Sequence, residues 1–260
     1  MERAEIERLG DALYLAMCDR RMVAPLTDSH PNLTIEQAYE ISLRFLANRL
    51  NAGEKIIGKK IGVTSAAVMD MLGVRQPDFG FITDAMRHDD VMAISGSLIQ
   101  PRAEGEIAFL LKKDLQGPGL TNADVLAATD AVMPCFEVVD SRIKDWQIKI
   151  QDTVADNASC GWFALNEAAA ISPTAVDLIN CEMTVCKNGE VISTGTGAAA
   201  MGNPVNCITW LANTLGTFGI TLEKGDVVLS GSLVPLEPVT AGDEMSLQIS
   251  GIGDCRVVFT

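Results

Sequence analysis

Three glutamates in apolar surroundings are the residues of this chain best suited to chemistry. Glu104 and Glu106 stand two apart in the sequence PRAEGEIAF and lead into an apolar run at 107–111. Because alternate residues of a strand share one face, both carboxylates are expected on the same side. Glu137 lies inside another apolar run, 131–139, where an unpaired carboxylate is costly to bury. The sequence therefore predicts that the three acids meet at one site.

Such a set of carboxylates suits a hard divalent cation, Mg²⁺ or Mn²⁺, which prefers oxygen ligands. A plainer alternative leaves the first two acids on a solvated face and pairs Glu137 with Arg102 or Arg142. The polar sequence DNAS at 156–159 is a further polar cluster in a nearly apolar setting. A polar cluster in such a setting calls for a functional explanation, and it therefore favours the metal site.

Composition limits the classes of partner. The chain has 260 residues, 48% of them hydrophobic, and a formal net charge of −14. This composition is typical of an ordered globular protein. The negative charge argues against binding to nucleic acid or to an anionic membrane surface. An anionic ligand would need a local cation to overcome the repulsion, which again favours a bound metal.

Cysteines, histidines and the N-terminal segment bear on the compartment. The seven cysteines form no CxxC pair and there are only two histidines, which argues against a zinc site and for free thiols in a reducing compartment. The N-terminal segment is too charged for a signal peptide, and no apolar run approaches the roughly 18 residues that a membrane span needs. We therefore expect a soluble cytoplasmic protein without a membrane partner.

The N-terminal portion, residues 1–54, is expected to be helical. Apolar residues at helical spacing predict a helix over 3–23, and Pro25 to Pro31 has the composition of a loop. Thr34 and Gln37 have capping-box spacing and predict a second helix that continues to Gly53. No linker follows, so these helices are expected to cover one structural unit formed by residues 55–260.

A lysine pair and an aspartate come next. The segment from Lys55 to Ser65 favours a strand that contains Lys59 and Lys60. Since neighbouring strand residues face opposite sides, only one of the two lysines can face a core site, and the other is expected at the surface. Asp78 lies in QPDFG, which has the composition of a turn.

The C-terminal half is expected to be rich in short strands. Asn188-Gly189 predicts a hairpin turn, and residues 205–218 predict a helix. GTGAAAMG at 195–202 matches a loose dinucleotide fingerprint, but Pro204 interrupts the helix that should follow and no βαβ unit surrounds it, which argues against a nucleotide site. Many short strands with few helices between them predict an α+β fold built on a mixed β-sheet roll or barrel.

Seven motifs in order resemble one known family across essentially the whole chain: GKKIGVTS, QPDFG, QPRAEGEIAF, EVVDSRIKDW, VADNASCG, KNGE and LSGSL. The chain resembles the 2-keto-4-pentenoate (2-hydroxypenta-2,4-dienoate) hydratases of aromatic meta-cleavage pathways. These belong to the fumarylacetoacetate hydrolase superfamily, together with the 4-oxalocrotonate decarboxylases. The resemblance implies that superfamily's C-terminal type of β-roll, with a small helical N-terminal portion, and assembly as a homo-oligomer.

The resemblance also implies roles for particular residues. Glu104, Glu106 and Glu137 match the family's metal-binding acids, Lys60 matches a lysine near the substrate, and Asp78 falls in the hydratase-type turn. The implied substrate pocket includes Ser159, Ser230, Gly231 and Ser232. No role is implied for Lys59.

The implied reaction is hydration of a small 2-hydroxy-dienoate, with Lys60 and Asp78 as acid/base groups. Two alternatives stay open at this point. One is a metal-dependent decarboxylase of 2-oxo-3-hexenedioate (4-oxalocrotonate), and the other is a non-catalytic partner subunit in a complex with such a decarboxylase.

Overall fold

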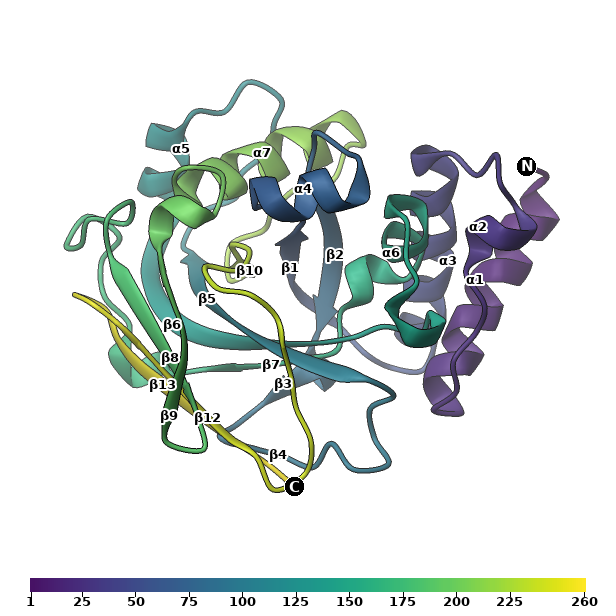
Figure 1. Cartoon of the computed structure of the whole chain (residues 1–260). Helices are drawn as coiled ribbons and strands as arrows, with labels where there is room; N and C mark the ends of the chain where they lie inside the picture. The colour runs from purple at the N-terminus through teal and green to yellow at the C-terminus, as the bar shows by residue number, and fades with distance from the viewer.

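Two β-sheets form the body of the molecule in the computed structural model (Figure 1). The structure describes the backbone of residues 1–260 and all side chains except those of Ala66, Ala67 and Met71. The larger sheet has the order β2-β1-β10-β5-β6-β7-β3, with β11 also paired to β5. Its strands are β1 (Ile56–Gly62), β2 (Asp78–Thr83), β3 (Arg87–His88), β5 (Pro101–Leu111), β6 (Thr129–Asp140), β7 (Trp162–Leu165), β10 (Val227–Leu229) and β11 (Glu237–Pro238).

The smaller sheet has the order β4-β13-β12-β8-β9. Its strands are β4 (Val91–Met92), β8 (Glu182–Lys187), β9 (Glu190–Thr196), β12 (Glu244–Ile249) and β13 (Gly253–Phe259). The predicted hairpin is confirmed: Asn188 and Gly189 both adopt left-handed φ values, 53° and 83°, between β8 and β9. The mixed, curled sheets confirm the predicted α+β roll.

The two sheets pack closely around an apolar core. Gly105 of β5 faces the smaller sheet, where a Cβ atom would lie 2.6 Å from the sulfur of Met183. Phe109, Phe136 and Leu247 are buried in the same core. Since residues alternate along β5, the face opposite Gly105 is the one that carries Glu104 and Glu106. The core therefore fixes which way the acids point.

Helices cover the remaining sides of the roll. The helices are α1 (Arg3–Cys18), α2 (Leu26–Ser29), α3 (Ile35–Asn51), α4 (Ala66–Leu72), α5 (Asn122–Ala128), α6 (Ile150–Ala155) and α7 (Pro204–Thr217). In Figure 1, α4, α5 and α7 lie together on one side, while α1, α2 and α3 lie beside α6. Among the described residues, none of the helices has the length and apolar character to cross a bilayer.

The N-terminal helices pack on α6 through a second apolar cluster, which contains Leu13 of α1, Phe45 of α3 and Val154 of α6. The predicted capping box at Thr34 and Gln37 is present. The first helix is shorter than predicted, because it ends at Cys18 and Arg20 adopts a φ of 55°. The predicted loop at 25–31 instead contains the single turn α2.

The glycines of the dinucleotide-like sequence serve close packing. A Cβ atom at Gly195 would lie 1.9 Å from the carbonyl oxygen of Leu233, and one at Gly197 would lie 1.8 Å from that of Leu178. The segment after β9 is a short 3₁₀ turn, and α7 begins at Pro204. These contacts explain the glycines without a ligand.

Candidate active site

The three glutamates come together on one face of the larger sheet. Glu104 of β5 lies directly opposite Glu137 of β6 in the antiparallel register. One carboxylate oxygen from each of Glu104, Glu106 and Glu137 lies within 4.8 Å of the others. Glu106 and Glu137 are buried, and Glu104 is half-buried. We call these three residues the acid cluster.

The acid cluster has carboxylate oxygens without a partner. Glu106 accepts a hydrogen bond of 2.8 Å from the Gly231 amide at Oε2, but its Oε1 and the Oε2 of Glu137 are buried and have none within the described residues. Burial and the neighbouring Glu137 raise the pKa of Glu104 to about 8, and the pKa of Glu106 lies well above its usual range for the same reasons. Three converging oxygen donors that cannot all ionise alone fit a hard divalent cation.

Lys60 is the counter-charge next to the acid cluster. Its Nζ lies 3.3 Å from Oε1 of Glu137, and both side chains are buried. Burial alone would lower the pKa of Lys60, but the surrounding carboxylates, above all Glu137, raise it overall. Lys60 is therefore held as an ammonium ion.

Asp78 is the first residue of β2, so its expected place in a turn is wrong. It is paired with Gly62 of β1, where a Cβ atom would lie 2.3 Å from Oδ1 of Asp78 and 3.3 Å from Nζ of Lys60. Oδ2 accepts a hydrogen bond from Thr153 at 3.4 Å, whereas Oδ1 is buried without a partner among the described residues. Burial raises the pKa of Asp78, against the opposing effect of Lys60. The glycine thus leaves room for an acid and an ammonium ion side by side.

Lys59 lies on the opposite face of β1 from Lys60 and is also buried. The expectation of a surface lysine is therefore wrong. Its Nζ lies 2.5 Å from Oδ2 of Asp226, just before β10. The two lysines have separate tasks, and that of Lys59 is an internal ion pair between neighbouring strands of the sheet.

A cavity of about 620 Å³ opens onto the acid cluster. It is lined by Lys60, Asp78 and Glu104, and by Ser159 and Ser232 of the predicted substrate residues. Ser230 and Gly231 are not among the residues that line the cavity. The Gly231 amide donates to Glu106, and the Ser230 hydroxyl is buried without a partner among the described residues.

Arg102, Trp146 and Thr153 also line this cavity, and sequence analysis gave them no role there. The alternation of β5 could have shown Arg102, because it stands two residues before Glu104. Trp146 and Thr153 come from other segments of the chain, and no local pattern connects them to the acids.

Comparison with known proteins places the chain in a family. A family model described as "Fumarylacetoacetate (FAA) hydrolase C-terminal" matches residues 67–260. The chain belongs to this family.

Two curated relatives are highly similar. A 2-hydroxypent-2,4-dienoate hydratase of Pseudomonas putida is 66% identical over 85% of this chain and 100% of the relative. A 2-hydroxyhexa-2,4-dienoate hydratase of Comamonas testosteroni is 57% identical over 98% of this chain and 97% of the relative. Among solved structures, 4-oxalocrotonate decarboxylase from Pseudomonas putida G7, complexed with magnesium and adipate, matches with a TM-score of 0.96 at 33% identity, over 100% of this chain and 99% of that one.

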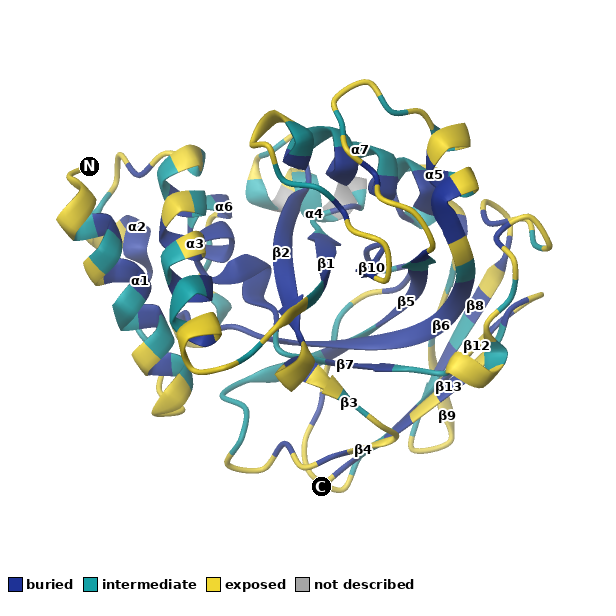
Figure 2. Cartoon of the chain, turned by 180° about the vertical axis from the view of Figure 1, so that it is seen from behind, coloured by how far each residue is buried: buried dark blue, intermediate teal, exposed yellow. Residues whose placement is uncertain are grey.

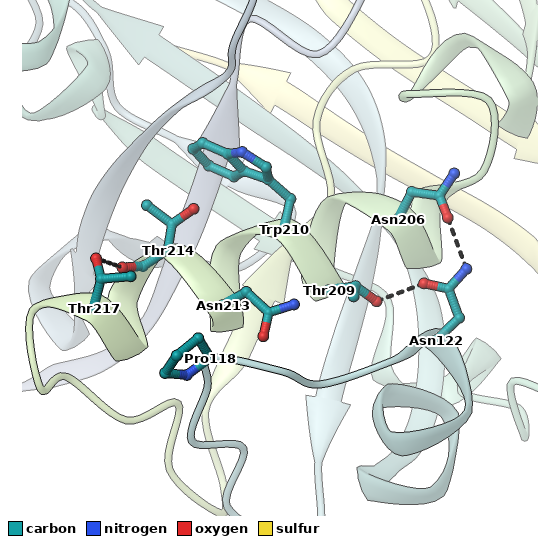
Figure 3. A pocket seen from close by; sticks show the side chains of 8 residues that line it. All are labelled: Pro118, Asn122, Asn206, Thr209, Trp210, Asn213, Thr214 and Thr217. Carbon is teal, nitrogen blue, oxygen red and sulfur yellow. Dashed lines mark hydrogen bonds between the residues drawn. The ribbon is translucent and has the colours of Figure 1, made fainter.

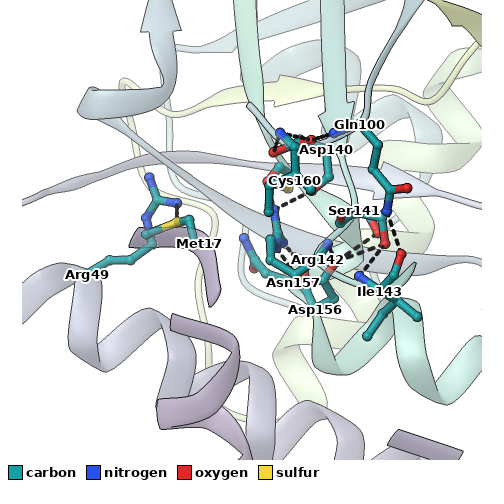
Figure 4. A network of polar contacts seen from close by, with 12 residues as sticks. Met17, Arg49, Gln100, Asp140, Ser141, Arg142, Ile143, Asp156, Asn157 and Cys160 are labelled. Carbon is teal, nitrogen blue, oxygen red and sulfur yellow. Dashed lines mark hydrogen bonds and ion pairs between the residues drawn. The ribbon is translucent and has the colours of Figure 1, made fainter. Parts of the chain in front are cut away.

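In this member of the fumarylacetoacetate hydrolase family, a buried ion pair supports the DNAS segment (Figure 4). Arg142 donates to Asp156 at 2.5 Å and to the carbonyl oxygens of Asp140 and Cys160 at 2.6 and 2.8 Å. Arg142 therefore pairs with Asp156, and Glu137 pairs with Lys60, so the plainer alternative for Glu137 is wrong.

The DNAS segment itself has an unusual backbone. Asn157, Ala158 and Ser159 all adopt left-handed φ values, between 51° and 55°. Non-glycine residues in this region store strain that the surrounding contacts must balance. The Asn157 side chain supplies such contacts by bonding both the amide and the carbonyl of Phe81 in β2. The segment is thus fixed as part of the wall beside Asp78.

A second hollow, of about 480 Å³, lies between α5 and α7 (Figure 3). Its lining residues are Pro118, Asn122, Asn206, Thr209, Trp210, Asn213, Thr214 and Thr217. None of them is an acid or a base, and Asn122 is bonded to both Asn206 and Thr209. This hollow offers no group for acid/base or metal chemistry.

Proposed function

We propose that this chain is a metal-dependent hydratase that adds water to 2-hydroxypenta-2,4-dienoate to give 4-hydroxy-2-oxopentanoate. The observation that carries the proposal is the buried acid cluster, with unpartnered oxygens, next to Lys60 and Asp78 in one cavity. The names of the curated relatives support the same substrate class.

Glu104, Glu106 and Glu137 would hold the divalent ion, Mg²⁺ or Mn²⁺. A bound ion of this kind acts as a Lewis acid that stabilises negative charge on the 2-oxygen of the substrate. The structurally similar decarboxylase of Pseudomonas putida G7 is complexed with magnesium, which supports this choice of metal.

The remaining steps belong to residues of the chain. Protonation of the dienoate at C5 gives an αβ-unsaturated 2-oxo acid, and water then adds at C4. Asp78 holds a proton more readily than an exposed carboxyl, because burial raises its pKa, and this suits a proton donor to carbon. Lys60 remains charged and can donate a hydrogen bond to a substrate oxygen. Ser159 and Ser232 would line the bound substrate.

A second candidate is decarboxylation of 2-oxo-3-hexenedioate, which the similarity to the decarboxylase structure favours. A non-catalytic partner subunit is less consistent with the chain, because a scaffold has no need for buried acids beside Lys60 and Asp78. We propose that the protein acts in the cytoplasm as a homo-oligomer. A complex with the decarboxylase of its pathway would be consistent with this role.

Product analysis tests the function directly. The purified protein is incubated with 2-hydroxypenta-2,4-dienoate and, separately, with 2-oxo-3-hexenedioate, each with and without Mg²⁺. We expect metal-dependent formation of 4-hydroxy-2-oxopentanoate. Faster release of CO₂ from the diacid would overturn the proposal in favour of the decarboxylase. Light scattering tests the oligomer, since a particle of single-chain mass at micromolar concentration would contradict it.

A further inference from the structure

Arg102 is a cation of the cavity wall that the proposed mechanism leaves without a task. It stands two residues before Glu104 on β5 and therefore shares the face that carries the acid cluster. Its guanidinium lies 4.8 Å from the centre of the Trp146 ring. Within the described part of the chain, no carboxylate lies at ion-pair distance from Arg102. The positive charge is thus supported by an aromatic face, and its N–H donors remain available.

Trp146 is held in a strained backbone conformation by hydrogen bonds. Its ring nitrogen donates to the carbonyl oxygen of Gln100 at 3.1 Å, and the Gln100 amide donates to the carbonyl oxygen of Ser141 at 2.8 Å. Asp145 and Trp146 both adopt left-handed φ values, 54° and 55°. Strained residues of this kind persist where surrounding contacts fix them, and they concentrate at functional sites. The strained turn orients the ring beneath Arg102, which is a second observation that points to a role for the arginine.

The net charge of the cavity explains why a further cation is useful there. The ionised acid cluster contributes three negative charges, Lys60 contributes one positive charge, and a divalent cation would bring the sum to zero. With Asp78 protonated, as the proposed proton donor, no positive charge is then left over for an anionic substrate. Arg102 supplies that charge. Lys60 cannot do so as well, because it is already paired with Glu137.

We propose that Arg102 binds the carboxylate of the 2-oxo acid substrate through its forked N–H groups. Arginine suits this task because its donors match both oxygens of a carboxylate. Arg102, Glu104 and Asp78 all line the same cavity, with Arg102 on β5 and Asp78 on β2. A substrate carboxylate held at Arg102 would therefore lie beside the acid cluster, in the cavity that also holds Asp78. This inference deepens the proposed function and rests on it for the identity of the substrate.

Binding of an unreactive analogue tests the inference without turnover. The probes are 2-oxopentanoate and its neutral amide, 2-oxopentanamide, titrated by calorimetry in excess Mg²⁺. Arg102→Gln should weaken the acid by roughly 10- to 100-fold, the range expected when a hydrogen bond to a charged group is lost, and leave the amide within about 2-fold. Arg102→Lys should fall between, because it keeps the charge and loses the fork.

Two controls accompany these variants. Arg87→Gln removes an exposed arginine that is paired with Glu167 on the surface, and it should bind both probes like the wild type. Titration with Mn²⁺ alone should show no weakening in Arg102→Gln, because removing a neighbouring positive charge cannot repel a cation. A loss of Mn²⁺ affinity would show that the substitution disrupts the site and would overturn the assignment.

The remaining outcomes separate this inference from the proposed function. Wild-type affinity of Arg102→Gln for 2-oxopentanoate, or equal losses for acid and amide, would overturn the role of Arg102. If the wild type fails to hydrate the dienoate while the acid-specific loss is observed, Arg102 is a 2-oxo acid binding residue and the hydratase proposal alone is wrong.

Discussion

Two groups of buried charges lie in this molecule, and they differ in how far their hydrogen bonds are satisfied. Around Arg142, the guanidinium donors reach the Asp156 carboxylate and the carbonyl oxygens of Asp140 and Cys160 (Figure 4). Around Lys60, one ammonium faces several acids, and buried oxygens of Glu106, Glu137 and Asp78 have no partner among the described residues.

The difference shows which buried charges mark a site. Both groups lie in the interior, which Figure 2 shows as dark blue along β5 and β6. Burial alone therefore does not distinguish them. A satisfied network fixes a structure, whereas unpaired acids in an enclosed place cost free energy that a ligand can recover. The comparison supports a structural role for Arg142 and the proposed chemical role of the acid cluster.

The largest effect is expected from breaking the acid cluster. Glu104→Gln, Glu106→Gln and Glu137→Gln should each lower kcat/KM by at least about 10³-fold, because metal stabilisation of the transition state contributes several kcal/mol. The thermal midpoint should not fall in Glu104→Gln and Glu106→Gln, since a neutral amide is less costly to bury than an unpaired carboxylate. It should fall in Glu137→Gln, because that change removes the ion-pair partner of buried Lys60. Full activity after exhaustive EDTA treatment, with metal absent by elemental analysis, would contradict the metal site.

Breaking the hydrogen-bonded network around Arg142 should instead lower the stability of the protein. Arg142→Met leaves Asp156 buried without its cation and should lower the free energy of unfolding by about 3–5 kcal/mol. Urea denaturation measures this value. The matched control is Arg256→Gln, which removes an exposed ion pair with Glu244 and should cost less than about 1 kcal/mol. Equal losses of unfolding free energy in the two variants would contradict a structural role for the Arg142 network.

Asp78→Asn sharpens the comparison within the site. The substitution keeps the shape of the side chain and removes its titrating group, so hydration should slow by about 10²-fold or more. Binding of 2-oxopentanoate should persist, because the proposed carboxylate contact is at Arg102. If the variant hydrates the dienoate at the wild-type rate, Asp78 is not the acid/base group.

The smallest effect is expected at a half-buried surface charge, Glu5. Its hydrogen bonds to Arg8, and then the charge of Arg8 and the neighbouring His30, lower the pKa of Glu5 to about 2. A carboxyl whose pKa is lowered on folding stabilises the protein above its ordinary pKa of 4.5, and this contribution is lost as the pH falls toward 2.

Glu5→Gln should therefore flatten the pH dependence of the thermal midpoint slightly between pH 4.5 and about 2. Glu40→Gln, which replaces an exposed acid on the neighbouring helix α3, is the control. A loss of thermal midpoint from Glu5→Gln that is as large at acid pH as at neutral pH, or larger, would contradict the assignment.

The sequence predicted the features that depend on local alternation. The common face of Glu104 and Glu106 follows from their spacing, and the hairpin at Asn188-Gly189 follows from turn chemistry. The partners of Lys59 and Arg142 could not be predicted in this way. Lys59 meets Asp226 because β10 lies beside β1 in the sheet. These two strands are far apart in the sequence, so their pairing cannot be predicted from local patterns.

Asp78 and Arg102 show the same limit inside the site. Local composition placed Asp78 in a turn, but pairing of β2 with β1 extends the strand to include it. Alternation could have placed Arg102 on the face of the acids, but its proposed role depends on Trp146, which a strained turn brings from another segment. Local sequence therefore predicts where the acids point, whereas the shape of the cavity around them depends on segments far apart in the sequence.

The packing of α3 on α6 has a consequence for how the chain could be divided. Phe45 and Val154 share a buried cluster, and α6 leads directly into the DNAS segment of the cavity wall. Gly53 follows α3 at the surface with a φ of 103°, and a Cβ atom there would meet nothing. Two separately produced fragments, 1–53 and 54–260, should therefore reassociate through that apolar interface. The helical fragment would act as a folding cofactor for the other, and activity would depend on the concentration of both.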